Sequence, residues 1–250
     1  MLTVAILTKN EELCLADCLE SVKGFADEIL VVDDGSEDRT VELAKKMGAK
    51  VLMHKLKSFS DKRNLAMDNS KGDWVFYLDA DERATDAFRR EVEDVFSNFI
   101  EEEEIGGYFI KRNNFYYGQE WKYIDRMHRL FYRKKFKTWK GDVHETAEID
   151  GKFGEIKNPI IHDTRKSIER MVEKTNNWSE IEADLRFRAH HPRMTTLRFI
   201  KVMITGFIQS YFKQNGYKNG TAGIIEAIYQ AFSLFITYAK LWEKQQQREQ

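Results

Sequence analysis

The sequence has little cysteine, no marked excess of either charge and no very long apolar run. Its two cysteines, Cys14 and Cys18, are one helical turn apart. With no distant partner they exclude a disulfide framework and predict a reducing compartment. Forty basic residues oppose forty-one acidic ones, so we expect no nucleic acid partner. The uncharged run 227–239 is shorter than the roughly 20 residues of a spanning helix.

Several familiar signatures are absent as well. The opening MLTVAILTKNEE has a short apolar run without a preceding basic segment or a cleavage site, which predicts a first strand and not a signal peptide. The glycine spacing of a dinucleotide fingerprint and the phosphate-binding loop G-x-x-x-x-G-K-[ST] do not occur. A Gly-rich basic loop, typical of sugar nucleotidyltransferases, is missing from 8–12. Each of these three missing motifs removes one class of nucleotide-binding enzyme.

The first hundred residues alternate between apolar runs and helical patterns. Apolar runs at 4–7, 28–32, 50–54 and 74–78 predict four strands. Helices are expected over 15–22 and 60–69, over a segment capped by Ser36 and closed by Gly48, and over 83–96. This alternation predicts an α/β fold, with a mostly parallel central sheet flanked by helices.

Polar residues follow three of these strands, in the segments Thr8-Lys9-Asn10-Glu11, Asp33-Asp34-Gly35-Ser36 and Asp79-Ala80-Asp81-Glu82. Ligands bind outside the carboxyl ends of parallel strands, so we expect the three segments to converge on one rim. The Asp-Gly segment is either a plain turn or a site for a base or a ribose. Taken alone, the Asp-x-Asp turn favours an acidic surface turn at the start of a helix. Its position after a buried strand favours a site for Mg²⁺ or Mn²⁺ with phosphate.

Four segments, VAILTKNEE, ILVVDDGSEDRT, SDKRNLAM and WVFYLDADE, resemble family-2 glycosyltransferases in their order and spacing. The resemblance implies the type A nucleotide-sugar transferase fold. It implies a catalytic domain over 1–165, with a nucleotide-sugar half (1–100) and an acceptor half (101–165), then a helical extension over 166–250. RLFYRKKFKTWKGDVHE, IIHDT and YAKLWE resemble more narrowly the small bacterial group that includes the lipopolysaccharide inner-core β-1,4-glucosyltransferase.

The resemblance also implies roles for single residues. Those expected to hold the nucleotide sugar are Thr8, Asn10, Glu11, Asp33, Asp34, Lys62, Arg63 and Asp79. Asp81, Asp79 and His162 would ligate a divalent cation. For His162 the alternative is a structural histidine, and for Lys62 and Arg63 it is a solvated basic turn. Glu82 is expected at a helix start or behind the ligands.

An inverting transfer needs one group near the acceptor hydroxyl to take its proton. Glu145, in the segment GDVHE, is the predicted base. His144 and Asp142 are alternatives, because many relatives carry a Glu-Asp pair where this chain has His144-Glu145. A nucleoside diphosphate leaving group is stabilised by a cation, so no second carboxylic acid is needed.

Arg129, Trp121 and Tyr117 are the expected acceptor contacts. The arginine would bind a phosphate or carboxylate of the acceptor, and the aromatic rings would stack on sugars. The alternatives are a charged strand edge that opposes aggregation and aromatic residues that belong to the core.

From Ser167 onward the chain is predicted to be helical, with apolar residues over 199–211 and 224–242. These two segments follow a complete domain and carry Lys, Arg, Tyr and Trp near their ends. That pattern is typical of helices lying on an anionic membrane surface, and a dimer interface is the alternative.

Together these features predict an inverting, metal-assisted glycosyltransferase with a carboxylate base. It would move a hexose from a nucleotide sugar, with a UDP-sugar favoured, to a lipid-linked or lipopolysaccharide-core acceptor. We expect a cytoplasmic protein, peripheral on the inner face of the cytoplasmic membrane. The alternatives are a polyprenyl-phosphate sugar transferase and a non-catalytic nucleotide-sugar-binding protein.

Overall fold

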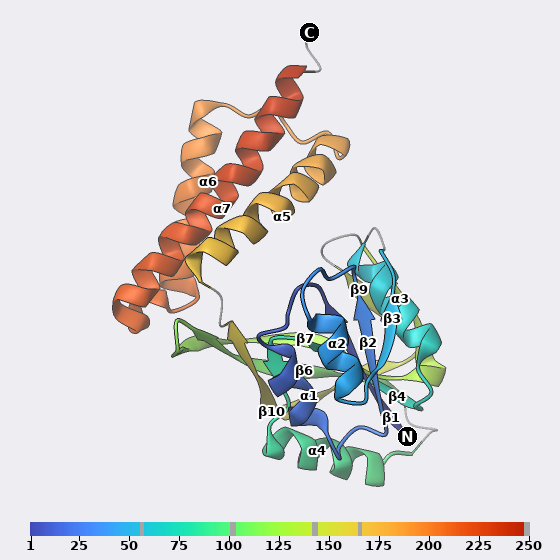
Figure 1. The fold of residues 1–250 in the computed structure, drawn as a ribbon. Coiled ribbons are helices and arrows are strands. Elements are labelled where there is room, and N and C mark those ends of the chain that lie inside the picture. The colour runs from blue at the N-terminus through green and yellow to red at the C-terminus, as the bar shows by residue number, and fades with distance from the viewer. Residues whose placement is uncertain (56–57, 101–103, 142–144, 165–166, 248–250) are drawn as a thin grey trace. The chain divides into compact units, whose positions relative to one another are not determined.

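The computed structural model of the chain describes residues 1–55, 58–100, 104–141, 145–164 and 167–247. Two of the predicted base candidates, Asp142 and His144, therefore lie outside the described residues. The chain forms two compact units (Figure 1). Unit 1 comprises 1–114 and 124–163, and unit 2 comprises 115–123 and 164–250.

Unit 1 is built on an eight-stranded sheet in the order β3-β2-β1-β4-β7-β6-β10-β5. Strands β1 to β4 pair in parallel, and β7 joins them antiparallel to β4. This confirms the predicted α/β fold with helices around a parallel sheet. The strands are β1 (Leu2–Thr8), β2 (Glu28–Asp33), β3 (Lys50–Met53), β4 (Trp74–Asp79), β5 (Glu82–Arg83), β6 (Ile105–Tyr116), β7 (Gln119–Tyr132) and β10 (Lys152–Thr164).

The register of the parallel strands brings their polar ends together. Thr8 at the end of β1 pairs with Asp33 of β2, and the preceding Leu7 pairs with Asp79 of β4. The predicted convergence of the three segments on one rim is therefore correct. β1 and β4 are buried along most of their length, as expected of parallel strands covered on both faces.

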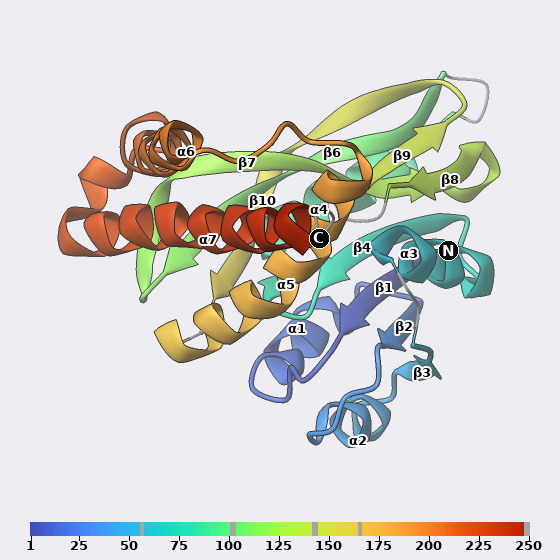
Figure 2. The same cartoon turned by 90° about the horizontal axis from the view of Figure 1, so that it is seen from above.

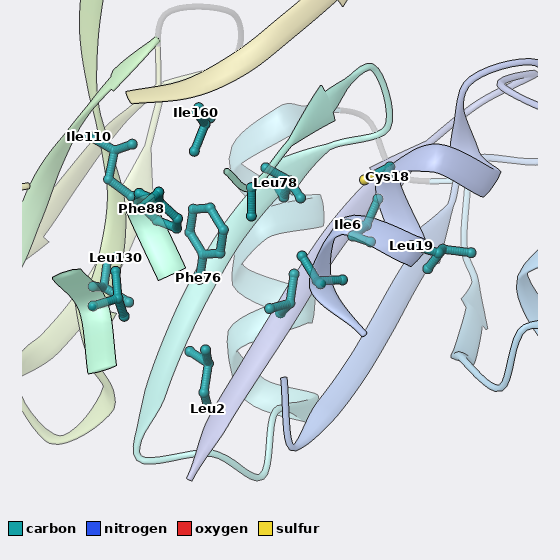
Figure 3. Close-up of a cluster of buried hydrophobic side chains, with 14 of the residues drawn as sticks. Leu2, Ile6, Cys18, Leu19, Phe76, Leu78, Phe88, Ile110, Leu130 and Ile160 are labelled. Carbon is teal, nitrogen blue, oxygen red and sulfur yellow. The ribbon is translucent and has the colours of Figure 1, made fainter. Parts of the chain in front are cut away.

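Alternate residues of the strands serve two cores, because successive side chains point to opposite faces. Val4 and Ile6 pack in a core with α1 (Leu15–Val22), α2 (Thr40–Lys46) and α4 (Asp86–Ser97). Figure 3 shows Phe76 of β4 beside Phe88 of α4 in this core. Ala5 and Tyr77 belong to the opposite core, with Ala66 of α3 (Phe59–Asn69) and Trp139.

The helix starts differ from the prediction at two places. α2 begins at Thr40, because the Ser36 hydroxyl donates to Asp33 (2.5 Å) and accepts from the backbone N–H of Asn10 instead of capping a helix. α4 begins at Asp86, not at 83, after an N-cap at Thr85 whose hydroxyl accepts from the N–H of Phe88 (3.1 Å). Glu82 pairs with His162 of β10 and belongs to β5, so its expected place at a helix start is wrong.

A two-stranded ribbon, β8 (Phe136–Lys140) and β9 (Thr146–Ile149), follows the short 3₁₀ helix Arg133–Lys135. Asn64 of α3 binds the backbone of β8 at both polar groups of one residue. Its Nδ2 donates to the carbonyl of Trp139 (3.0 Å), and its Oδ1 accepts from the N–H of Trp139 (2.8 Å). A side-chain amide of the helix thus pairs with the ribbon as a neighbouring strand would.

Unit 2 is helical and includes the tip of the β6–β7 hairpin. Figure 2 shows α7 between α5 and α6, and a small core contains Ala183, Met194 and Leu241. Within the described residues, the segment Gly216–Gln247 is long and apolar enough to span a membrane by length and composition alone, and 227–239 is only part of it. The helices are α5 (Ile168–Arg188), α6 (Thr196–Ile208), the π-helical Gln209–Lys213, the 3₁₀ helix Gly216–Asn219 and α7 (Gly220–Gln247).

Candidate active site

The turns after β1 and β2 are joined by hydrogen bonds. Asn10, with φ +54°, accepts at its Oδ1 from the N–H of Glu37 (2.8 Å). The N–H of Glu11 donates to the Thr40 hydroxyl (2.9 Å). The exposed side chain of Asn10 therefore fixes the shape of this part of the rim.

The two aspartates of the second turn have different surroundings. Asp33 is fully buried, and its carboxylate accepts from the hydroxyl of Thr8 (3.2 Å) and from the N–H groups of Gly35 and Ser36. It therefore organises its own turn, so the expected direct contact of Asp33 with a nucleotide does not fit its burial. Asp34 is the residue of this pair that faces outward.

Asp34 forms an ion pair with Lys62, with 2.8 Å between Oδ2 and Nζ. The side chain of Lys62 is only 10% exposed, whereas Lys9, 3.6 Å from the same oxygen, is 59% exposed. Lys62 lies beside the ring of Phe59. Its Nζ is 4.7 Å from the centroid of that ring, so an aromatic face and a carboxylate hold the charge at the rim, which argues against the alternative of a solvated basic turn.

Asp79 is held by arginines. Arg129 donates to both of its carboxylate oxygens (3.1 and 2.5 Å), and Arg63 lies 3.7 Å away. Burial alone would raise the pKa of Asp79, but the charges of Arg129 and Arg63 outweigh it and hold that pKa well below its usual range. These positive charges make Asp79 a poor ligand for a second cation, and Asp81 remains the better one.

Arg129 does not occupy the position expected of an acceptor contact. It is 3% exposed, and besides Asp79 its guanidinium contacts Glu82 (3.4 Å). Burial lowers the pKa of Arg129, but the two carboxylates outweigh this and raise it above its ordinary value. The residue faces the interior because the end of β7 is covered on both sides, so its predicted role as an acceptor contact is wrong.

Trp121 and Tyr117, the other two expected acceptor contacts, belong to unit 2. Trp121 is 4% exposed and packs edge-on against Tyr116. Its burial contradicts a role as an open stacking platform. Tyr117 is partly exposed, has φ +52° and donates from its hydroxyl to the sulfur of Met171. Its role stays a prediction.

Glu145, the predicted base, contacts Arg63, with 3.0 Å between Oε1 and Nε. Arg63 is 5% exposed and packs over the rings of Tyr77 and Trp139. Its neighbouring contact with Asp79 places the predicted base and the Asp-x-Asp turn on either side of one guanidinium. A buried arginine thereby fixes where the carboxylate of Glu145 lies.

A second network lies behind the acidic turn. Fully buried Glu82 accepts from the N–H of Asp79 (2.9 Å) and from Arg112 (3.0 Å). Arg112 also donates through Nε and Nη2 to Asp125 (3.1 and 2.6 Å). Burial alone would raise the pKa of Asp125, but hydrogen bonds from Arg112 and Asn114 lower it. Asp125 is therefore ionised at neutral pH.

Asp81 lies opposite His162. The His162 Nε2 is 3.5 Å from the Asp81 Oδ2, and both side chains are nearly buried. His162 Nδ1 contacts Asn114 Oδ1 (2.7 Å). Within the described ranges, no group of three or more His, Cys, Asp or Glu side chains could hold a metal ion. Since Mg²⁺ is commonly bound by one or two carboxylates and substrate phosphates, Asp81 fits a cation shared with a diphosphate, and His162 adjoins that position.

Sequence reasoning overlooked Arg112, Asn114 and Asp125. Arg112 and Asn114 are two residues apart in β6, a spacing that puts both on one face of a strand. The available signal was weak, because Lys111 and Asn113 are polar as well and the four residues do not alternate with apolar ones. Asp125, which joins them, comes from β7 and could not be assigned without the pairing of the strands.

Comparison with known proteins matches residues 3–148 to the model of the family "Glycosyl transferase family 2". An uncharacterized glycosyltransferase of Rickettsia typhi is 30% identical over 253 residues, covering 95% of this chain and 85% of the relative. The lipopolysaccharide core biosynthesis glycosyltransferase LpsC of Rhizobium meliloti is 26% identical, covering 97% of this chain and 92% of its own.

Among solved structures, glucosyl-3-phosphoglycerate synthase from Mycobacterium tuberculosis, in complex with Mn²⁺, UDP and glucosyl-3-phosphoglycerate, is similar to part of the chain. The identity is 22% and the TM-score is 0.36, over 47% of this chain and 44% of that one.

Proposed function

Since the chain belongs to glycosyl transferase family 2 and is a glycosyltransferase, we propose that it transfers a hexose from a nucleotide sugar with inversion. The observation that carries this proposal is the rim itself. Asp34, Asp79 and Asp81 lie at the carboxyl ends of β2 and β4, the two parallel partners of β1. Buried Lys62 and Arg63 lie beside them. Positive and negative groups on one rim suit a donor with a polar nucleoside and a charged diphosphate.

Asp81 and His162 would hold a divalent cation, Mg²⁺ or Mn²⁺, together with the diphosphate. Such an ion supplies stabilisation of the charge that develops on the leaving group. Lys62, with its charge at the rim, would bind the nucleotide side of the donor. Asp34 would accept from the base or the ribose, and Asn10 would keep the turn after β1 in place for that contact.

Glu145 would accept the proton of the acceptor hydroxyl as that oxygen attacks the anomeric carbon. The bond from that carbon to the donor phosphate breaks, and the nucleoside diphosphate leaves. Arg63 orients the Glu145 carboxylate through Oε1. An ionised carboxylate has about four lone-pair positions, so the contact leaves acceptor capacity for a hydroxyl.

The donor is best tested by thermal shift with a panel of nucleotide sugars in Mn²⁺ or Mg²⁺. A ligand that binds only the native state raises its stability by mass action, and we expect a UDP-sugar to give the largest shift. Asp81→Asn should abolish the metal-dependent part of that shift. Asp86→Asn, a matched change at an exposed helix start, should retain it. Absence of any stabilisation by nucleotide sugars would contradict the proposal.

The acceptor we propose is a lipid-linked oligosaccharide or a lipopolysaccharide core. The relation to LpsC supports this class. A polyprenyl phosphate is the second candidate, and it would need no strong base because it is already ionised. Glu145→Gln separates the two. Near-complete loss of transfer fits a hydroxyl acceptor, whereas nearly normal turnover fits a phosphate.

We further propose that unit 2 binds the anionic inner face of the cytoplasmic membrane. Large apolar side chains of α6 and α7 are exposed, including Leu197 (79%), Ile204 (54%) and Ile228 (56%). Between 193 and 240 the sequence has six Lys or Arg residues but one acid, Glu226, which is buried. Apolar surface with a basic rim suits anionic lipid.

Flotation of the full chain with vesicles tests this location. The protein should float with phosphatidylglycerol-containing vesicles and much less with phosphatidylcholine alone. Combined Leu197→Ser, Ile204→Ser and Ile228→Ser should abolish flotation, whereas Ile124→Ser, equally exposed in unit 1, should not. A triple variant that still floats would contradict the proposal, and a concentration-dependent dimer lost in the same variant would favour the interface alternative.

A further inference from the structure

We propose that Asn114 is a positioning residue that fixes the tautomer of His162, so that the lone pair of Nε2 faces Asp81. The proposal concerns the protein without ligand. It rests on the proposed function only for what the Asp81–His162 pair would then hold.

The argument begins at Asp125. Its Oδ1 accepts from Arg112 Nε (3.1 Å) and lies 3.0 Å from Asn114 Nδ2. An ionised carboxylate can only accept, so the amide NH₂ of Asn114 must face it. The reverse orientation of the amide would put two acceptor oxygens together at a side chain that is 4% exposed, where unpaired polar contacts are costly.

This orientation leaves the Oδ1 of Asn114 toward His162, 2.7 Å from its Nδ1. The amide oxygen is an acceptor, so Nδ1 must carry the hydrogen. In a neutral imidazole the other nitrogen, Nε2, then has a lone pair. The chain of hydrogen bonds thus has a fixed order. Asp125 orients the amide of Asn114, and Asn114 in turn decides which nitrogen of His162 carries the hydrogen.

The distance at Nε2 agrees with this assignment. Nε2 and the Asp81 Oδ2 are 3.5 Å apart, whereas charge-assisted N–H···O bonds measure about 2.7–2.9 Å. Two acceptor atoms that face each other at this separation are suited to a shared cation. A metal-binding histidine commonly donates its second N–H to a fixed acceptor, which selects the binding nitrogen.

Of Arg112, Asn114 and Asp125, Asn114 is the residue that can be substituted with the fewest other effects. Arg112 also holds Glu82, and Asp125 also holds Arg112, so changing either would disturb the buried ion pairs. Asn114 contacts only Asp125 and His162 among the side-chain hydrogen bonds described. A substitution at 114 can therefore alter the histidine with limited effect elsewhere.

The experiment is long-range ¹H–¹⁵N NMR of the metal-free full chain labelled at histidine, with His162 assigned by His162→Gln. In the wild type His162 should give one protonated Nδ1 and one unprotonated Nε2. Asn114→Leu, which removes the acceptor for Nδ1, should lose this single tautomer. Asn113→Leu, the same change on the opposite face of β6, is the matched control. If Asn114→Leu does not fold, Asn114→Ser, whose hydroxyl is too short to reach, replaces it.

A protonated Nε2 in the wild type, or an unchanged tautomer in Asn114→Leu, would overturn the proposal. A second readout is Mn²⁺ binding in the presence of UDP, followed by electron paramagnetic resonance. Loss of the Asn114 contact should weaken it about 10- to 100-fold. If the tautomers behave as expected but the wild type binds no Mn²⁺, the metal-assisted function fails while the role of Asn114 stands.

Discussion

Unit 1 buries charged side chains in pairs, whereas unit 2 leaves many large apolar side chains at its surface. Arg129 and Glu82 are at most 3% exposed in unit 1. In unit 2, Leu197, Ile204 and Phe212 are each more than half exposed. Buried ion pairs fix positions more than they add stability, and exposed apolar surface marks an interaction site. The difference therefore suggests that unit 1 positions reacting groups and unit 2 provides attachment.

The largest effect on stability is expected from Arg129→Met in unit 1. It leaves the carboxylates of Asp79 and Glu82 without their shared partner, and breaking a buried ion pair in this way costs about 3–5 kcal/mol. The free energy of unfolding from urea titration measures the loss. Arg90→Met, at an exposed position of α4, should change it by less than about 0.5 kcal/mol. Equal effects of the two variants would mean that the buried charges are not specially coupled.

The small core of unit 2 gives the next effect. Leu241 is fully buried against α5 and α6 residues, and Leu→Ala at such a site costs about 2–5 kcal/mol. Leu241→Ala should lower the melting temperature of the unit 2 helices, as measured by circular dichroism. Hydrogen exchange in β1 and β4 should stay unchanged. Faster exchange in those strands as well would show that the two units unfold together.

The pH dependence of the free energy of unfolding tests the buried carboxylates of unit 1. The pKa values of Asp79 and Asp125 are lower in the folded state than in the unfolded chain. Their contribution to the free energy of unfolding is therefore complete at neutral pH. It is lost as the pH falls below about 4, where the unfolded chain takes up protons first. Asp125→Asn should make the loss of stability on acidification shallower, as measured by urea unfolding over this pH range. Parallel curves for variant and wild type would exclude a contribution of Asp125.

The smallest effect is expected at the exposed surface of unit 2. Ile204→Ser should change the free energy of unfolding by less than about 0.5 kcal/mol, because its side chain is more than half exposed. The same variant should reduce vesicle flotation. A large loss of stability would instead indicate that Ile204 belongs to a core.

The parallel half of unit 1 could be predicted from sequence because its signals are local. Apolar runs ending in Asp33 and Asp79 identify strands, and parallel strands bring their ends to one rim. Arg129 was misplaced because strand periodicity does not distinguish an exposed face from one that is covered and paired. The partners of Arg129 are 47 and 50 residues away in the chain.

The three acids of the Asp79–Glu82 turn illustrate the same limit. Sequence reasoning favoured a cation as the partner of Asp79 and Asp81 and placed Glu82 at a helix start or behind the ligands. In the structure Asp79 and Glu82 are neutralised by arginines, and Asp81 faces His162. Composition alone could not divide the acids in this way, because the arginines come from β6 and β7. The assignment required the order of strands in the sheet.

Adjacent residues of α3 hold β8 and the residue that precedes β9, since Asn64 binds the backbone of β8 and Arg63 contacts Glu145. One added residue before them in the helix would rotate both side chains by about 100°. Both contacts would then be lost together. Over evolution the length of the α3 segment between Ser58 and Asn64 should therefore be conserved more strictly than its sequence.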